Sequence, residues 1–196
     1  MGVQYERASI AAGVSAVAVS LLAVVLATLV SPSFAWTSHA LSNLGEPGHA
    51  VATDLTRLLF NSGLKLGGLL GLGFSYVLFV HARNPFEYVG VAAFVVSMLA
   101  MGAIGVFPAG TTLHFPAFLT FYGSLTAALL GFGVGTLLAG ERERGLATIL
   151  LAVVNVGSWV VWMLGGPLLR PGLAIPEFVV ALVLGGWMLT TSTRYR

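Results

Sequence analysis

Six long apolar stretches, separated by short polar connections, make up most of this chain and decide the solvent in which it can fold. They cover residues 8–30, 58–80, 88–107, 113–138, 146–165 and 173–190. Each is close to the roughly 20 residues that a helix, rising about 1.5 Å per residue, needs to cross a hydrocarbon core about 30 Å thick. Because backbone polar groups find no water there, each stretch must be helical. The sequence therefore predicts an all-α polytopic membrane protein, a bundle of six transmembrane helices.

Composition supports this class and excludes others. The apolar fraction is 57% and only 8% of residues are charged, whereas about a quarter are charged in soluble proteins. A net charge of +2 is too small for a basic patch, so we expect a lipid bilayer and no nucleic acid as partner. The absence of cysteine excludes disulfides and thiolate metal sites. Over 196 residues we expect one domain, with a long outer loop at residues 31–56.

The arginines predict the orientation of the bundle. If the N-terminus is cytoplasmic, most of them fall on the inner side: Arg7, Arg83, Arg142, Arg144, Arg194 and Arg196. Only Arg57 and Arg170 then fall outside. This is the asymmetry of the positive-inside rule, so we expect a multi-pass protein of the cell membrane with both termini cytoplasmic. The Glu-Arg-Glu-Arg turn at residues 141–144 is interpreted as a solvated charge run.

Two patterns run along the second apolar stretch. Asn61 and Lys65 lie four residues apart on one predicted helix face. Gly63, Gly67 and Gly71 form a ladder on another face, which favours close packing against a neighbouring helix. We therefore expect the glycines to hold the helix on one side while the other side offers polar groups.

Lys65 can be accommodated in two ways. An ionisable residue inside a span costs roughly 2.5–3.5 kcal/mol on insertion scales, so the side chain either reaches back to the interface or finds an acidic partner. The nearest candidate acids are Glu46, Asp54 and Glu177.

The predicted outer helix ends add further polar groups. Thr111 and Thr112 are plausible N-caps for a helix with His114 in its first turn. Pro176 suits a first helical position, which puts Glu177 directly after it. In the predicted topology, the polar residues of the outer loop, of the second stretch and of these helix ends all lie at or just below the outer membrane surface. We therefore predict one ligand-binding pocket near the outer face. Its candidate residues are Ser42, Asn43, Asn61, Lys65, His114 and Glu177.

Four segments, in this order, resemble an uncharacterised family of small archaeal and bacterial membrane proteins, the domain of unknown function nine-nine-eight. They are Trp36-Thr-Ser-His-Ala-Leu-Ser-Asn43-Leu-Gly, Phe60-Asn61-Ser-Gly-Leu, Gly105-Val-Phe-Pro followed by His114, and Pro176-Glu177. The resemblance implies six helices and a membrane location, and it supplies no activity. The family usually has Leu-Ser-Asp-Leu-Gly in the loop, so Asn43 lacks the carboxylate that an acid-dependent mechanism would need.

Two classes of function remain. The sequence holds no Gly-rich phosphate loop, His-Glu-x-x-His helix or Gly-x-Ser-x-Gly elbow. His39, His49 and His114 could converge on zinc, but their spacing is not diagnostic, so no metal or cofactor is predicted. We favour a module that binds or passes a lipid or small ligand, or scaffolds a membrane partner or second copy. The alternative is a hydrolase-like enzyme of the outer leaflet, with His114 as base and Asn61, Lys65 and Glu177 assisting.

Overall fold

The computed structural model describes residues 2–165 and 172–195, and over these ranges the chain is helical without strands. The helices are α1 (Gly2–Leu29), α2 (Asp54–Val80), α3 (Pro85–Val106), α4 (His114–Leu138), α5 (Arg142–Leu164) and α6 (Ala174–Arg194), with a short 3₁₀ helix η1 (Leu41–Gly45). All six α-helices are long and apolar enough to cross a membrane, which confirms the predicted fold class. Arg170 and Arg196, used in the charge count, lie outside the described residues.

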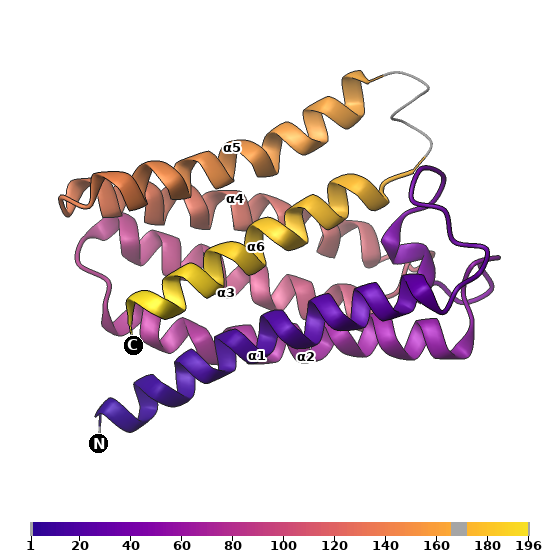
Figure 1. Ribbon diagram of the computed structural model, residues 1–196, viewed down its shortest axis with the longest axis horizontal. Helices are drawn as coiled ribbons and strands as arrows, with labels where there is room; N and C mark the ends of the chain where they lie inside the picture. Colours follow the sequence, from indigo (N-terminus) through magenta and orange to yellow (C-terminus); the bar gives the residue numbers. More distant parts are fainter. Residues whose placement is uncertain (1, 166–171, 196) are drawn as a thin grey trace.

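The helices run along the long axis of the molecule, as Figure 1 shows. Both termini lie at one end, here called the terminal end, and the loop of residues 30–53 lies at the other, here called the loop end. Each helix contacts the next in sequence, and α6 contacts both α1 and α5. In the core of the bundle, Trp187 of α6 packs on two aromatic rings. Its ring centroid lies 5.6 Å from that of Phe94 in α3 and 5.1 Å from that of Phe132 in α4.

The glycine ladder of α2 is a packing face, as predicted. A Cβ atom on Gly63 would lie 2.3 Å from Cβ of Ala23 in α1, and one on Gly67 would lie 2.9 Å from Cβ of Ser20. Glycine thus lets the two helices approach closely where larger residues would separate them. Ser9 of α1 strengthens this contact by donating to the carbonyl of Gly73 at 2.7 Å.

The face of α2 that carries Asn61 and Lys65 is also closely packed, and the expectation that this side is free to offer polar groups is wrong. A Cβ on Gly68 would lie 2.6 Å from the carbonyl oxygen of Met98 in α3. One on Gly105 of α3 would lie 2.4 Å from the carbonyl oxygen of Asn61 and 3.0 Å from Cγ of Lys65. The small residues of α3 bring its backbone onto this face, so the face holds a helix and not a pocket.

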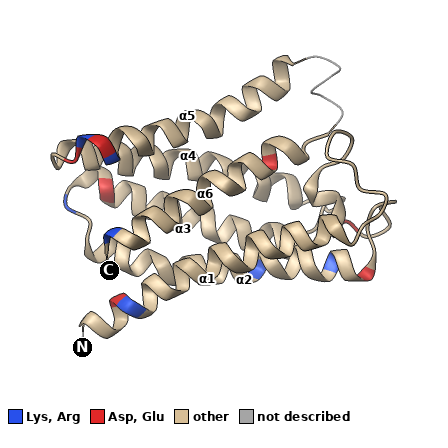
Figure 2. Cartoon of the chain, in the orientation of Figure 1, with Lys and Arg blue, Asp and Glu red and all other residues tan. Residues whose placement is uncertain are grey.

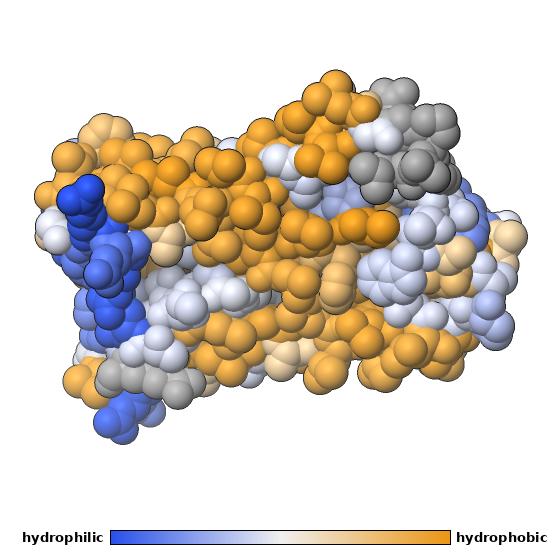
Figure 3. Space-filling model, turned by 45° about the horizontal axis from the view of Figure 1, so that its top comes forward, coloured by the Kyte–Doolittle hydropathy of each residue, from blue (hydrophilic) through white to orange (hydrophobic). Residues whose placement is uncertain are grey.

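The surface matches a bilayer environment. An apolar band covers most of the length of the molecule, between a hydrophilic terminal end and a mixed loop end (Figure 3). Charged residues gather mainly at the two ends of the bundle (Figure 2). Helix α5 is the least buried, with 11% of its apolar window inside the protein against 50% for α3 and α6. Most of its side chains therefore face the surroundings.

An ion-pair network ties the terminal end together. Arg83 donates to Glu87 at 2.5 Å and also to Glu141, which in turn accepts from Arg194 at 2.5 Å and Arg144 at 2.7 Å. Partial burial opposes ionisation of Glu141, but hydrogen bonds from Arg144 and Arg83 hold the pKa of its carboxyl below the ordinary value. Interpreting the 141–144 turn as only a solvated charge run was therefore wrong, because Glu141 links three chain segments.

Candidate functional site

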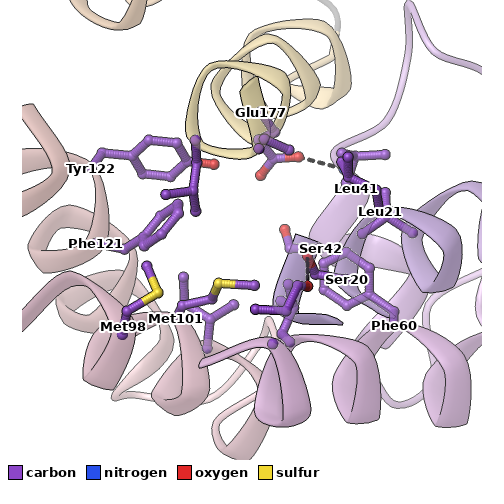
Figure 4. Close-up of a pocket in the computed structure, with 18 of the residues that line it drawn as sticks. Ser20, Leu21, Leu41, Ser42, Phe60, Met98, Met101, Phe121, Tyr122 and Glu177 are labelled. Atoms are coloured by element: carbon purple, nitrogen blue, oxygen red, sulfur yellow. Dashed lines mark hydrogen bonds between the residues drawn. The ribbon is translucent and has the colours of Figure 1, made fainter. Parts of the chain in front are cut away.

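A cavity lies between the helices toward the loop end. Helices α1, α2, α3, α4 and α6 surround it and η1 adjoins it, and the space open to the centre of a water-sized sphere measures about 70 Å³. Most of its lining is apolar, as Figure 4 shows for Leu21, Phe60, Met98, Met101 and Phe121. An apolar chain therefore finds a matching environment inside the bundle.

Polar groups gather at one side of this cavity. Glu177, only 7% exposed, accepts a hydrogen bond from the backbone N–H of Leu41 at 2.5 Å. In Figure 4 the hydroxyl of Tyr122 points across toward this carboxylate, and Ser42 lies at the edge of the same space. The Tyr122 hydroxyl makes no hydrogen bond within the described residues. The cavity thus combines a mainly apolar lining with polar groups at one side, here called the polar corner.

His114 also lines the cavity, as the first residue of α4. Its Nδ1 lies 2.9 Å from the carbonyl oxygen of Phe107. Because a carbonyl can only accept, Nδ1 carries the proton, and a neutral imidazole then presents Nε2 as an acceptor. Leu113 occupies the N-cap position, not Thr111 or Thr112. The threonine prediction was wrong because Thr111 instead donates to the carbonyl of Pro108 at 2.8 Å.

The loop of residues 30–53 covers the loop end of the bundle and is here called the cap. Asn43 stabilises its conformation. Its Oδ1 accepts from the backbone N–H of Ala40 at 2.8 Å, and its Nδ2 donates to Glu46 at 2.9 Å. These bonds close the turn of η1 and direct the backbone N–H of Leu41 toward α6. An amide can supply both a donor and an acceptor, so asparagine serves this turn without a carboxylate.

Asn61 seats the cap on α2. Its Nδ2 donates to the carbonyl of Gly45 at 3.0 Å, and Thr56 donates to the carbonyl of Leu44 at 2.9 Å. On the other side, the N–H of Ala174 in α6 donates to the carbonyl of His39 at 3.0 Å. The loop is therefore bonded to two helices.

The structure divides the six predicted pocket residues into two groups. Ser42, His114 and Glu177 line the cavity, and Asn43, Asn61 and Lys65 do not. The proposed Lys65–Glu177 ion pair is not formed. Lys65 is exposed, with its stem against Gly105, and the alternative in which its side chain reaches back to the interface stays a prediction. Phe118 and Phe121, which follow His114 along α4, also line the cavity.

Sequence reasoning missed Tyr122 and the backbone N–H of Leu41. A tyrosine among apolar residues in mid-helix gives no signal of its own, and a backbone amide gives none at all. The prediction also started α6 at Pro176, whereas the helix begins at Ala174. Glu177 is thus the fourth residue of α6, still in its first turn, and it lines the cavity.

The histidines of the loop are used for backbone contacts. Nδ1 of His39 accepts from the N–H of Ala35 at 3.0 Å, and Nδ1 of His49 accepts from the N–H of Val51 at 3.3 Å. Over residues 2–165 and 172–195 there is no group of three or more His, Cys, Asp or Glu side chains that could hold a metal ion. The arrangement suits binding through shape and hydrogen bonds.

Comparison with known proteins gave one match. The family model described as "Protein of unknown function (DUF998)" matches residues 11–194, nearly the whole chain. Neither the curated proteins nor the solved structures contain a match.

Proposed function

The chain belongs to this family, whose description names no activity, and from its cavity we propose that it binds a lipid or another small amphipathic molecule within the bundle. The observation that carries the proposal is the division of the cavity into an apolar length and one polar corner. Glu177, Tyr122 and Ser42 supply the polar corner, His114 also lines the cavity, and mainly apolar side chains of five helices supply the rest. A long-chain ligand would place its chain among the apolar side chains and its head at Glu177.

The position of Glu177 supports a binding role. A carboxylate within a membrane span is costly, so such residues are by default functional-site hypotheses. Here the carboxylate is held against the cap by the backbone N–H groups of Leu41 and Ser42 and also borders the cavity. A purely structural acid would be expected to have its bonding capacity filled by the protein.

The enzyme alternative has less support. It requires His114 to act with Asn61 and Lys65, and neither of those side chains lines the cavity. Asn61 is engaged with the carbonyl of Gly45, and Lys65 is exposed. A base without a positioned nucleophile fits binding better than acyl transfer.

For orientation, we propose that the loop end faces outward and both termini face the cytoplasm, following the arginine count. A reporter fused after Arg196 should then be active only in the cytoplasm. Activity of that fusion on the external side would reverse the proposed orientation.

Photolabelling can test the binding proposal. Dodecanol carrying a diazirine in its chain should label cavity residues such as Met98, Met101 and Phe121 in the detergent-solubilised protein. An Ala181→Leu variant, which fills part of the cavity, should reduce this labelling severalfold. The matched variant Ala127→Leu, on an exposed position of α4, should not reduce it. Labelling that is confined to exposed side chains, or that is indifferent to Ala181→Leu, would contradict the proposal.

A further inference from the structure

We infer that the ligand of this cavity carries a protonated amine at the end of its apolar chain. The inference rests on the proposed binding function and adds the chemical class of the head group. It starts from the charge of the cavity lining. Glu177 is the one acidic residue that lines it, and no lysine or arginine among the described residues does so.

The bonding of Glu177 leaves room for a cationic donor. One oxygen accepts from the N–H of Leu41, and no described basic side chain lies within ion-pair distance of the carboxylate. Burying an ion without a counter-charge costs several kcal/mol, and an opposite charge in good geometry offsets that cost. An ammonium group seated at the open side of Glu177 would supply the missing charge.

The other polar groups fit the same head. An ammonium group has three N–H donors and no acceptor, so it needs acceptors around it. The hydroxyl oxygens of Tyr122 and Ser42 and the Nε2 of a neutral His114 can each accept, and all three residues line the cavity. Tyr122 and Phe118, whose ring centroids are 4.5 Å apart, add aromatic faces, which attract cations.

Anionic heads are disfavoured by the same lining. A carboxylate or phosphate head would lie beside the acid Glu177 and would find no arginine or lysine among the described lining residues to pair with it. Such cations are the usual ligands of these groups. The arginines at the terminal end already pair with acids, as for Arg83 with Glu87 and Glu141.

Three probes with the same chain test the inference at neutral pH. They are dodecylamine, dodecanol and dodecanoate, each with a diazirine at the same chain carbon. In the parent protein, dodecylamine should label the cavity at about tenfold lower concentration than dodecanol, because a charge-assisted hydrogen bond is stronger than a neutral one. Dodecanoate should label it least.

The variants locate the effect. In Glu177→Gln the advantage of dodecylamine over dodecanol should disappear, while Glu143→Gln, an exposed acid at the other end, should keep it. Tyr122→Phe should reduce the advantage in part, and it decides the question if Glu177→Gln fails to fold. Phosphatidylethanolamine, added as a competitor, distinguishes two sources of the amine. If it displaces dodecylamine, the ligand is a phospholipid with an amine head; if it does not, the ligand is a free long-chain amine.

The outcomes separate the two proposals. The inference of a protonated amine would be contradicted if dodecylamine and dodecanol labelled the cavity equally, or if dodecylamine kept its advantage over dodecanol in Glu177→Gln. The proposed binding function would not be affected by either result. Absence of cavity labelling by all three probes would overturn both.

Discussion

Two buried carboxylates at opposite ends of the bundle show how differently the same group can be held. Glu87, in the first turn of α3, is 2% exposed and accepts from the guanidinium and the backbone N–H of Arg83, with Thr136 also donating to it. Glu177, in α6, is 7% exposed and accepts from backbone N–H groups of η1, with that of Leu41 at 2.5 Å. Glu87 is enclosed by protein, whereas Glu177 borders a cavity.

The difference separates a structural acid from a candidate binding acid. Glu87 has a permanent counter-charge, so its charge contributes to the architecture of the terminal end. Glu177 has a hydrogen bond that orients it but no counter-charge among the described residues. We therefore expect substitutions at the terminal end to change stability, and those at Glu177 to change binding.

Removing Arg83 should have the largest effect. Arg83→Ala leaves Glu87 buried without its cation, and breaking a buried pair in this way costs about 3–5 kcal/mol. We expect the free energy of unfolding, measured by circular dichroism in detergent, to fall by that amount. Arg142→Ala, on an exposed arginine next to the network, is the matched control and should change it by less than about 0.5 kcal/mol. If Arg83→Ala changed the unfolding free energy only slightly, Glu87 could no longer be distinguished from Glu177 as a structural acid.

Crowding the terminal end without removing a charge should give an intermediate effect. A Cβ atom on Gly135 of α4 would lie 2.5 Å from Cγ of Glu87 and 2.9 Å from Oδ1 of Asn84. Gly135→Ala should therefore lower the unfolding free energy by about 1–3 kcal/mol, as overpacking does. Gly123→Ala on the same helix would meet nothing within 4 Å and should be neutral or stabilising, because alanine favours helix. Equal results for the two variants would mean that the network tolerates displacement.

Neutralising Glu177 should change stability little. In Glu177→Gln the side-chain carbonyl can still accept from the N–H of Leu41, so we expect a change below about 1 kcal/mol in unfolding free energy. Glu177→Leu removes the acceptor and should cost more, about 1–3 kcal/mol, since it leaves a buried donor unpaired. If the Gln variant were as unstable as Arg83→Ala, Glu177 would have to be treated as a second structural acid.

Acidification should show the smallest effect, and it tests the terminal end alone. The pKa of Glu141 is lowered in the folded protein from its ordinary 4.5, mainly by hydrogen bonds from Arg144 and Arg83 against the opposing effect of burial. Its contribution is therefore present above about pH 4.5 and is lost as the pH falls through the lowered pKa. We expect the parent to lose about 1 kcal/mol or less relative to Glu141→Gln over that window, by thermal unfolding at stepped pH. Parallel curves for the two proteins would contradict this linkage.

The sequence predicts the six helices because length and apolarity alone decide which segments a bilayer accepts. It does not predict which face of a helix borders open space, because neighbouring helices decide that. Asn61 and Lys65 share a face, as their spacing indicates, but Gly68 of α2 and Gly105 of α3 let α3 pack against it. Glu177 could be proposed from its charge, whereas Tyr122 depends on how α4 is rotated against α6. The Arg83–Glu87 pair, four residues apart, was within reach of sequence reasoning and was missed.

The contact between the loop and α6 has a consequence for how the protein is made. The hydrogen bond from Leu41 to Glu177 joins residues 136 positions apart in sequence, and Trp36 stacks edge-on against Phe178 with ring centroids 5.1 Å apart. During synthesis the first five helices enter the membrane before the residues that hold the cap exist. The cavity can therefore be closed only after α6 has been made, and a chain truncated before α6 would lack one of its walls and the one acidic side chain among its described lining residues.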